Sequence, residues 1–325
     1  MQRREFIILL GGAAALPLVA RAQQAMPVIG YLHVGSAGAR RDQLASFQRG
    51  LSELGFVHDR NVSIEYRWAD SRYERLTELA ADLIHRNVAV IVAPGGAPAT
   101  RAAKALTTTT PIVFSTSADP VQTGLVASLN RPGGNITGIT DMAADVGGKQ
   151  LGLMHELLPG AVHFALLVNP GGAMAEPTIV EVQSAASAIG CQIDVVRART
   201  ADDIDAVFAG FAQKRPDALL VGINVLFTDR RVQLVTLATR HGIPTMYSLR
   251  EFAEAGGLMS YASNTIDRER QLGVYTGRIL KGEKPADLPI LRATKFELVI
   301  NLQTAKVLGL DVPPTLLARA DEVIE

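Results

Sequence analysis

The sequence predicts an α/β protein with two Rossmann-like, doubly wound lobes joined by crossing hinge segments. Short apolar runs alternate with amphipathic stretches along the chain, which is the pattern of parallel sheets covered by helices on both faces. A chain of 325 residues is long enough for two such lobes, each with its own core. The composition agrees with this fold class, because 48% of the residues are hydrophobic and only 5% are aromatic.

Residues 1–22 have the features of a secretory signal peptide. The arginine pair at positions 3 and 4 precedes an apolar run at 7–19, and residues 20–22 read Ala-Arg-Ala, a small-residue cleavage pattern. The apolar run is too short to span a bilayer permanently. The Arg-Arg-x-Phe-Ile sequence also resembles a twin-arginine signal, although Sec export can use the same residues. We expect an exported protein whose mature form begins near Gln23, with an uncleaved anchor as the alternative.

Four strand–helix units are expected in the first lobe, because each apolar run is followed by turn residues and an amphipathic stretch. The expected strands are residues 27–34, 62–68, 88–92 and 111–114. The expected helices are one that follows Gly38 and ends at Gly55, then 73–85 and 99–106, and one that starts at Asp119-Pro120 and ends before Arg131. The last helix has a capping carboxylate followed by proline at its start. A further strand at 136–140 leads toward the second lobe.

The second lobe is expected to repeat this scheme. Its expected strands are 162–168, 191–196, 218–223, 243–246, 257–261 and 295–301, and its expected helices are 146–158, one from about 177, 201–213, 230–241, 249–255 and 304–308. A helix at 267–280, followed by a polar break at 281–287, completes the set. The expected division is residues 27–138 with 265–288 in the first lobe and 139–264 with 289–325 in the second.

Polar residues follow several strands of the first lobe, at the sheet edge where open α/β sheets bind ligands. Ser115 and Thr116 end the fourth strand, and Asp119 lies just beyond them as a ligand contact or a cap. The pair Gly95-Gly96 allows a small anion to approach the following helix N-terminus, or forms only a tight turn. His33 ends the first strand, as a ligand contact or as a structural histidine.

In the second lobe, the strand ends carry Asn169, Asn224, Tyr247 and Ser248. Arg250 follows them, where it could pair with a ligand carboxylate or equally with a carboxylate of the protein. A clamshell in which both sets of strand ends face one cleft would bury a ligand by hinge motion.

Charge and motif content exclude several function classes. Lys plus Arg equals Asp plus Glu, 32 each, so there is no basic excess for nucleic acid. The single cysteine, Cys191, allows neither an internal disulfide nor a zinc site. We find no P-loop, nucleophile elbow, HExxH or dinucleotide-binding motif. We therefore expect a binding protein without catalytic residues, cofactor or metal. The alternatives are an exported hydrolase or oxidoreductase and a sensory protein that presents a solute to a receptor.

Five segments of the chain resemble one family. They are RREFIILLGGAAALPLVARAQQ, PVIGYLHVGS, PIVFSTSADPVQTGLVASLNRPGGNITG, EFAEAGGLMSYA and TKFELVINLQTAKVLGLDVPPTLLARADEVIE. Together they resemble the ABC transporter substrate-binding proteins related to the tryptophan-binding lipoproteins. The resemblance implies a type I periplasmic binding protein fold, and delivery of a small solute to an inner-membrane permease with its ATPase. It also implies an amino acid or small aromatic carboxylate as the ligand.

The resemblance further assigns the ligand-facing loops by position. They fall on residues 33–36, 95–97, 115–119 and 247–250, and on Asn169 and Asn224. Two further candidate ligand contacts, Ser36 and Ala97, come from the first two of these loops. This chain lacks the cysteine that anchors the lipoprotein relatives. We therefore expect a protein free in the periplasm, and a monomer.

Overall fold

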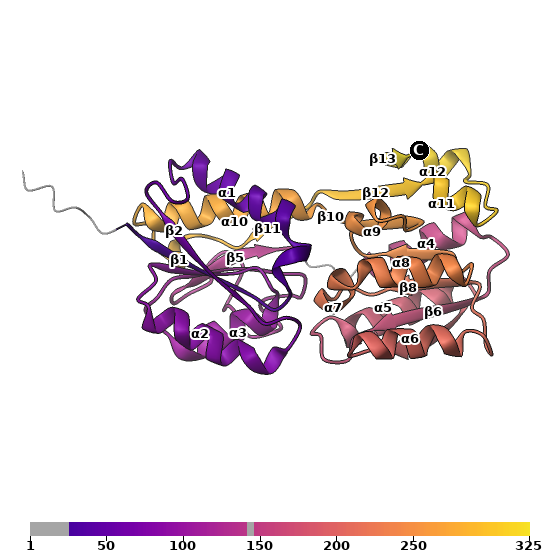
Figure 1. Ribbon diagram of the computed structural model, residues 1–325, viewed down its shortest axis with the longest axis horizontal. Helices are drawn as coiled ribbons and strands as arrows, with labels where there is room; N and C mark the ends of the chain where they lie inside the picture. Colours follow the sequence, from indigo (N-terminus) through magenta and orange to yellow (C-terminus); the bar gives the residue numbers. More distant parts are fainter. Residues whose placement is uncertain (1–25, 142–145) are drawn as a thin grey trace, which may run out of the picture.

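The computed structural model describes residues 26–141 and 146–325. These residues form two α/β lobes that lie side by side along the longest axis of the molecule (Figure 1). The predicted signal peptide at 1–22 lies outside the described residues. Within the described ranges, no helix has both the length and the apolar character needed to cross a membrane.

The first lobe is built on a six-stranded parallel sheet with the strand order β11-β5-β4-β3-β1-β2. The strands are β1 Val28–His33, β2 Ser63–Trp68, β3 Val90–Ala93, β4 Ile112–Thr116, β5 Ile136–Thr140 and β11 Leu291–Arg292. Every residue of β3, β4 and β5 is buried, because helices cover both faces. The order 2-1-3-4-5 is that of a doubly wound sheet, and it confirms the predicted fold class.

Helices cover both faces of the sheet of the first lobe (Figure 1). They are α1 Arg41–Glu53, α2 Leu76–His85, α3 Ala97–Leu106 and α10 Thr265–Leu280, with one-turn 3₁₀ helices η1 Ala37–Ala39, η2 Tyr73–Arg75 and η4 Pro285–Asp287. One core packs α2 and α3 against the sheet, and the other packs α1 and α10 against its opposite face. Helix α10 thus belongs to the first lobe although it follows most of the second lobe in sequence.

The second lobe has a seven-stranded sheet with the order β13-β12-β10-β9-β8-β6-β7. Strands β10 and β12 pair antiparallel, and the other neighbouring strands in this order pair parallel. Its strands are β6 His163–Val168, β7 Gln192–Arg197, β8 Ala218–Val221, β9 Thr245–Tyr247, β10 Met259–Ser263, β12 Phe296–Asn301 and β13 Glu322–Ile324. Its helices are α4 Val146–Leu157, α5 Ala175–Ala188, α6 Ala201–Gly210, α7 Val225–Asp229, α8 Arg231–Arg240, α9 Arg250–Glu254, α11 Leu302–Val307 and α12 Pro314–Leu317. Again each face of the sheet has its own apolar core.

The chain passes between the lobes after β5, between β10 and α10, and between β11 and β12. Strand β5 pairs with β4 as far as Thr140, and β11 pairs with β5. Hydrogen bonding in the first sheet therefore continues past the predicted boundaries at 138 and 288. The difference arises because strand pairing, which the sequence does not display, decides where each lobe ends.

The predicted helix after Asp119 is wrong, because residues 120–124 form a turn and residues 125–130 are bends and irregular chain. Gly124 adopts φ +70°, a left-handed conformation that interrupts a helix. The amides of Leu125 and Val126 both bond to the carbonyl of Pro120, so the regular helical ladder does not develop. Asp119 instead closes a local turn by accepting hydrogen bonds from the amides of Val121 at 2.7 Å and Gln122 at 3.2 Å.

Candidate functional site

A cavity of about 130 Å³ lies between the two lobes. In the first lobe, the loops after β1, β3 and β4 line it, at the carboxyl ends of these strands. In the second lobe, the loops after β6 and β8 line it, and the start of α10 completes the wall. Both sheets thus present their carboxyl ends to one space, which is where doubly wound folds bind ligands. For scale, an engineered cavity of about 150 Å³ accommodates benzene.

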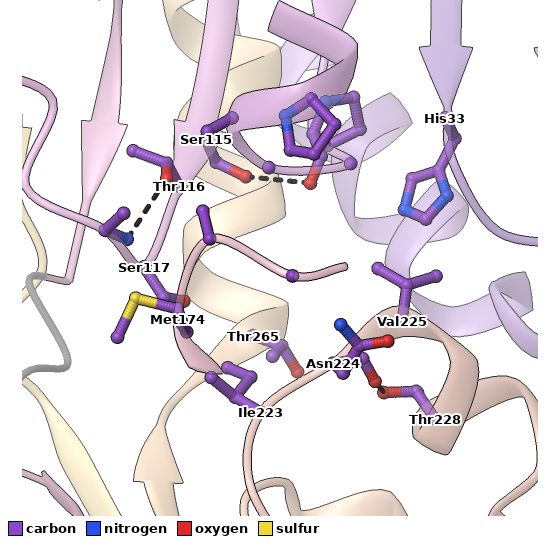
Figure 2. Close-up of a pocket in the computed structure, with 18 of the residues that line it drawn as sticks. His33, Ser115, Thr116, Ser117, Met174, Ile223, Asn224, Val225, Thr228 and Thr265 are labelled. Atoms are coloured by element: carbon purple, nitrogen blue, oxygen red, sulfur yellow. Dashed lines mark hydrogen bonds between the residues drawn. The ribbon is translucent and has the colours of Figure 1, made fainter. Parts of the chain in front are cut away.

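His33, at the end of β1, offers the cavity a fixed hydrogen-bond donor. Its Nδ1 accepts a hydrogen bond from the amide of Gly35 at 2.8 Å, so in the neutral ring the proton sits on Nε2. The ring points toward the cavity (Figure 2). Burial, and secondly the charge of Arg40, hold the pKa of His33 well below its ordinary value. The imidazole is therefore neutral at physiological pH.

The loop after β3 brings main-chain groups to the cavity wall. A Cβ on Gly95 would lie 2.7 Å from the amide nitrogen of Val34, so only glycine allows the two loops to approach this closely. Gly96 has φ +82° and precedes α3 without a side-chain cap. The first turn of α3, from Ala97, therefore presents uncapped amides and the positive end of its dipole beside the cavity. Such a terminus favours a negative ligand group.

Three hydroxyl side chains extend this wall from the end of β4 (Figure 2). Ser115 donates to the carbonyl of Pro94 at 3.3 Å, and Thr116 accepts from the amide of Ala118 at 3.1 Å. Ser117 donates to the carboxylate of Asp141 at 3.3 Å. The Thr116 hydroxyl accepts the hydrogen bond from Ala118, so its own proton is available to a ligand.

In the second lobe, Asn224 caps α7 and faces the cavity (Figure 2). Its Oδ1 accepts from the amide of Leu226 at 3.0 Å and from the side chain of Asn169 at 3.2 Å. Asn169 therefore lies behind Asn224 and orients it. The Asn224 amide group reaches the Tyr73 hydroxyl of the first lobe at 3.5 Å. Since this distance is long, the group retains capacity to donate to a ligand.

Apolar side chains cover much of the remaining wall. Met174, Ile223 and Val225 come from the second lobe (Figure 2), and Tyr73 comes from the first. A concave site with an apolar part and a few convergent polar groups is typical of a small-molecule site.

Two arginines and one glutamate line the cavity. Arg40 pairs with Asp229 at 3.0 Å, and Arg268 pairs with Asp141 at 2.5 Å. All four side chains are at least seven-eighths buried. Glu269, from α10, is 5% exposed, and burial raises the pKa of its carboxyl to about 7, against the nearby charges of Arg268 and Arg40.

Asp229 of α7 joins the lobes beside the cavity. Besides Arg40, it accepts hydrogen bonds from the amide of Ser36 at 3.0 Å and the hydroxyl of Ser71 at 3.2 Å, all three from the first lobe. Gln43 of α1 makes a second contact between the lobes, donating to Glu251 of α9 at 2.7 Å. These contacts hold the two cavity walls against each other.

Seven of the predicted site residues line the cavity: His33, Gly95, Gly96, Ala97, Ser115, Thr116 and Asn224. Six lie outside its lining: Ser36, Asp119, Asn169, Tyr247, Ser248 and Arg250. Ser36 binds Asp229 through its amide, Asn169 supports Asn224, and Asp119 closes its own turn, as described above.

The predicted group at 247–250 is engaged within the second lobe. Tyr247 is 1% exposed and stacks on Phe252 with ring centroids 4.7 Å apart. Ser248 donates to the carbonyl of Val221 at 2.6 Å. Arg250 pairs with three carboxylates, at 2.8 Å with Glu254 and Glu322 and at 3.4 Å with Glu297. Of the alternatives for Arg250, the structure shows the ion pair with carboxylates of the protein.

The sequence interpretation did not identify the charged residues of the lining, Arg40, Arg268 and Glu269. One signal was present for Glu269. It lies three, seven and ten residues before Leu272, Thr276 and Ile279, which are among the buried positions of α10. A carboxylate on the buried face of an amphipathic helix indicates a special environment.

A family model described as ABC transporter substrate binding protein matches residues 32–324. Among curated proteins, the tyrosine-binding protein of Clostridioides difficile strain R20291 is 25% identical over 269 residues, which cover 81% of this chain and 75% of that protein.

Two solved structures share the fold over nearly the whole chain. A conserved domain protein from Vibrio cholerae superposes with a TM-score of 0.84, and a domain from Streptococcus pneumoniae in complex with L-Trp with a TM-score of 0.83. Each is 24% identical, and each match covers 92% of this chain and 99% of the other.

Proposed function

The chain belongs to the family of ABC transporter substrate-binding proteins, and from that premise we propose that it is the solute-binding component of an ABC uptake transporter. Its ligand is an amino acid or a small aromatic carboxylate, captured in the cavity between the lobes. The observation that carries this proposal is the cavity itself, where the carboxyl ends of both sheets converge on one space.

The lining supports a ligand with an anionic end and an apolar body. The uncapped start of α3, the Thr116 hydroxyl and the His33 Nε2–H gather donors in the first lobe. Met174, Ile223 and Tyr73 offer apolar contact to a side chain. The relatives named for tyrosine binding and solved with L-Trp support an aromatic amino acid.

The proposal includes a location and partners. We place the mature protein in the periplasm as a monomer, exported by the signal at 1–22. There its two lobes close on the solute by hinge motion, and the closed form delivers it to an inner-membrane permease and its ATPase. The contacts between Asp229 and the first lobe are suited to the closed form, because hinge opening would separate them.

A thermal-shift screen of the chain from Gln23 tests the proposal. A ligand that binds only the folded state at 100 times its Kd adds about 2.7 kcal/mol to stability. We expect one class among amino acids and small aromatic acids to raise Tm by several degrees, with the ligand recovered unchanged. A panel without any shift would contradict solute capture, and conversion of the ligand would indicate an enzyme instead.

A further inference from the structure

Glu269 is a buried carboxylate of the cavity wall without an ion-pair partner among the described residues. The two arginines of the lining each have a carboxylate partner, Asp229 for Arg40 and Asp141 for Arg268. The hydrogen bond to Glu269 comes from the Tyr31 hydroxyl at 3.5 Å, the long limit for such a bond. A buried ionised carboxylate is unfavourable unless a positive group approaches it.

The position of Glu269 is fixed by the packing of α10. This helix lies against α1 so closely that a Cβ on Gly273 would be 2.1 Å from the carbonyl oxygen of Phe47. Glu269 lies one turn before Gly273 on the same helix. The carboxylate is therefore held at the cavity by a rigid element, which is the arrangement expected for a specific binding group.

Other polar groups of the cavity wall are hydrogen-bond donors, in contrast to the anionic Glu269. The start of α3, the Thr116 hydroxyl and the His33 Nε2–H are donors, suited to a carboxylate. The lining thus combines a donor-rich region with one anionic side chain. A zwitterion that carries both an ammonium and a carboxylate group matches this combination.

We propose that Glu269 forms an ion pair with the protonated amine of the ligand, so that the ligand is an amino acid and not an amine-free aromatic acid. This inference rests on the proposed function and narrows its ligand class. An acid without the amine would leave Glu269 without an ion-pair partner, because Arg40 and Arg268 are paired with Asp229 and Asp141. A site built for a polar group strongly rejects analogues that lack it.

The ionisation of Glu269 makes a second prediction testable, the dependence of ligand affinity on pH. Burial raises its pKa to about 7, the charges of Arg268 and Arg40 lower it, and Tyr31 contributes a hydrogen bond. His33, on the same cavity, stays neutral. A bound ammonium group favours the ionised carboxylate, so binding below pH 7 must release a proton. We expect the affinity for an amino acid to fall about tenfold from pH 8 to pH 6.

Isothermal titration of the chain from Gln23 tests the inference. The probes are L-tyrosine and L-tryptophan, their amine-free analogues 3-(4-hydroxyphenyl)propionate and 3-indolepropionate, and tryptamine, which lacks the carboxylate. We expect an amino acid to bind about 100-fold more tightly than its amine-free analogue. Glu269→Gln should abolish most of this preference and the pH dependence. Glu283→Gln, at an exposed carboxylate paired with Arg278 just beyond α10, should preserve both.

Equal binding of an amino acid and its amine-free analogue by the unmodified protein would overturn the inference and leave solute capture intact. A folded Glu269→Gln variant that keeps the preference would overturn it as well. If neither the amino acids nor the amine-free acids bind, the proposed function fails together with the inference. The comparison of ligands on the unmodified chain does not depend on the folding of any variant.

Discussion

At the scale of single residues, the hydrogen bond from the Gly35 amide to His33 Nδ1 fixes the tautomer of the imidazole ring. The bond assigns the proton to Nε2, and burial keeps the ring neutral by lowering its pKa. In the unfolded chain the same histidine would take up a proton below about pH 6.5. Stability contributed by the neutral ring is therefore present above that pH and is lost as the pH falls below it.

This linkage predicts the effect of His33→Gln on the pH profile. Below about pH 6.5, the unmodified protein should lose about 1.4 kcal/mol of unfolding free energy per pH unit more than the variant does. Urea unfolding at several pH values between 7.5 and 5 measures the difference. Parallel profiles for the two proteins would show that His33 titrates alike in the folded and unfolded states.

At this scale the sequence shows where along a strand a residue lies, and that position decides some of the placements around the cavity. Ser115 and Thr116 end β4, and Gly95 follows β3, so all three line the cavity at the carboxyl ends of buried parallel strands. Tyr247 also follows a strand, but its ring turns into the core against Phe252. Glu269 comes from a distant helix. Such placements depend on tertiary packing, which no local pattern encodes.

At the scale of secondary-structure elements, the contact between α1 and α10 sets the shape of the first lobe. A Cβ on Gly50 would lie 1.9 Å from the carbonyl oxygen of Arg270, and one on Gly273 would lie 2.1 Å from that of Phe47. Neither neighbour is a side chain that could turn away, since both are main-chain atoms. The two glycines therefore determine how closely the helices approach.

We expect Gly50→Ala and Gly273→Ala each to destabilise the protein by about 1–3 kcal/mol, because the helices must separate to admit the methyl group. Gly152→Ala is the matched control, since Gly152 is an exposed position of α4 with open space around it. The control should be neutral or stabilising by up to about 1 kcal/mol. Chemical denaturation measures all three, and equal stability of the three variants would contradict the close helix contact.

Most elements follow from apolar periodicity, and the exceptions have physical causes. Asp119 and Pro120 do begin a turn, as their pattern indicates. The turn does not continue as a helix, because Gly124 adopts a left-handed backbone conformation. Helix α7 has only five residues, too few to show a period. Strand β11 has two residues and exists through its pairing with β5.

At the scale of the whole molecule, Asp229 connects the lobes through three hydrogen bonds, to Ser36, Arg40 and Ser71. If the lobes close on the solute, these bonds stabilise the closed form. A ligand that binds only the closed form has an apparent Kd that rises as the closed population falls.

Asp229→Asn should therefore weaken solute binding about 10-fold, because the amide replaces a charge paired with Arg40. The radius of gyration from small-angle X-ray scattering should also increase relative to the unmodified protein at equal ligand concentration. Asp205→Asn serves as the control, since Asp205 bonds to Gln233 within the second lobe. Unchanged affinity and size for Asp229→Asn would show that these bonds play no part in closure.

The late position of α10 in the sequence has a consequence for biosynthesis. Leu272, Tyr275 and Ile279 of this helix cover Ile29, Tyr31 and Phe47, which emerge from the ribosome more than 200 residues earlier. Until α10 has been synthesised, α1 alone covers that face of the first sheet, and part of its apolar surface stays exposed. The nascent polypeptide must then either remain unfolded or rely on a chaperone, and a product truncated before residue 265 would be prone to aggregate.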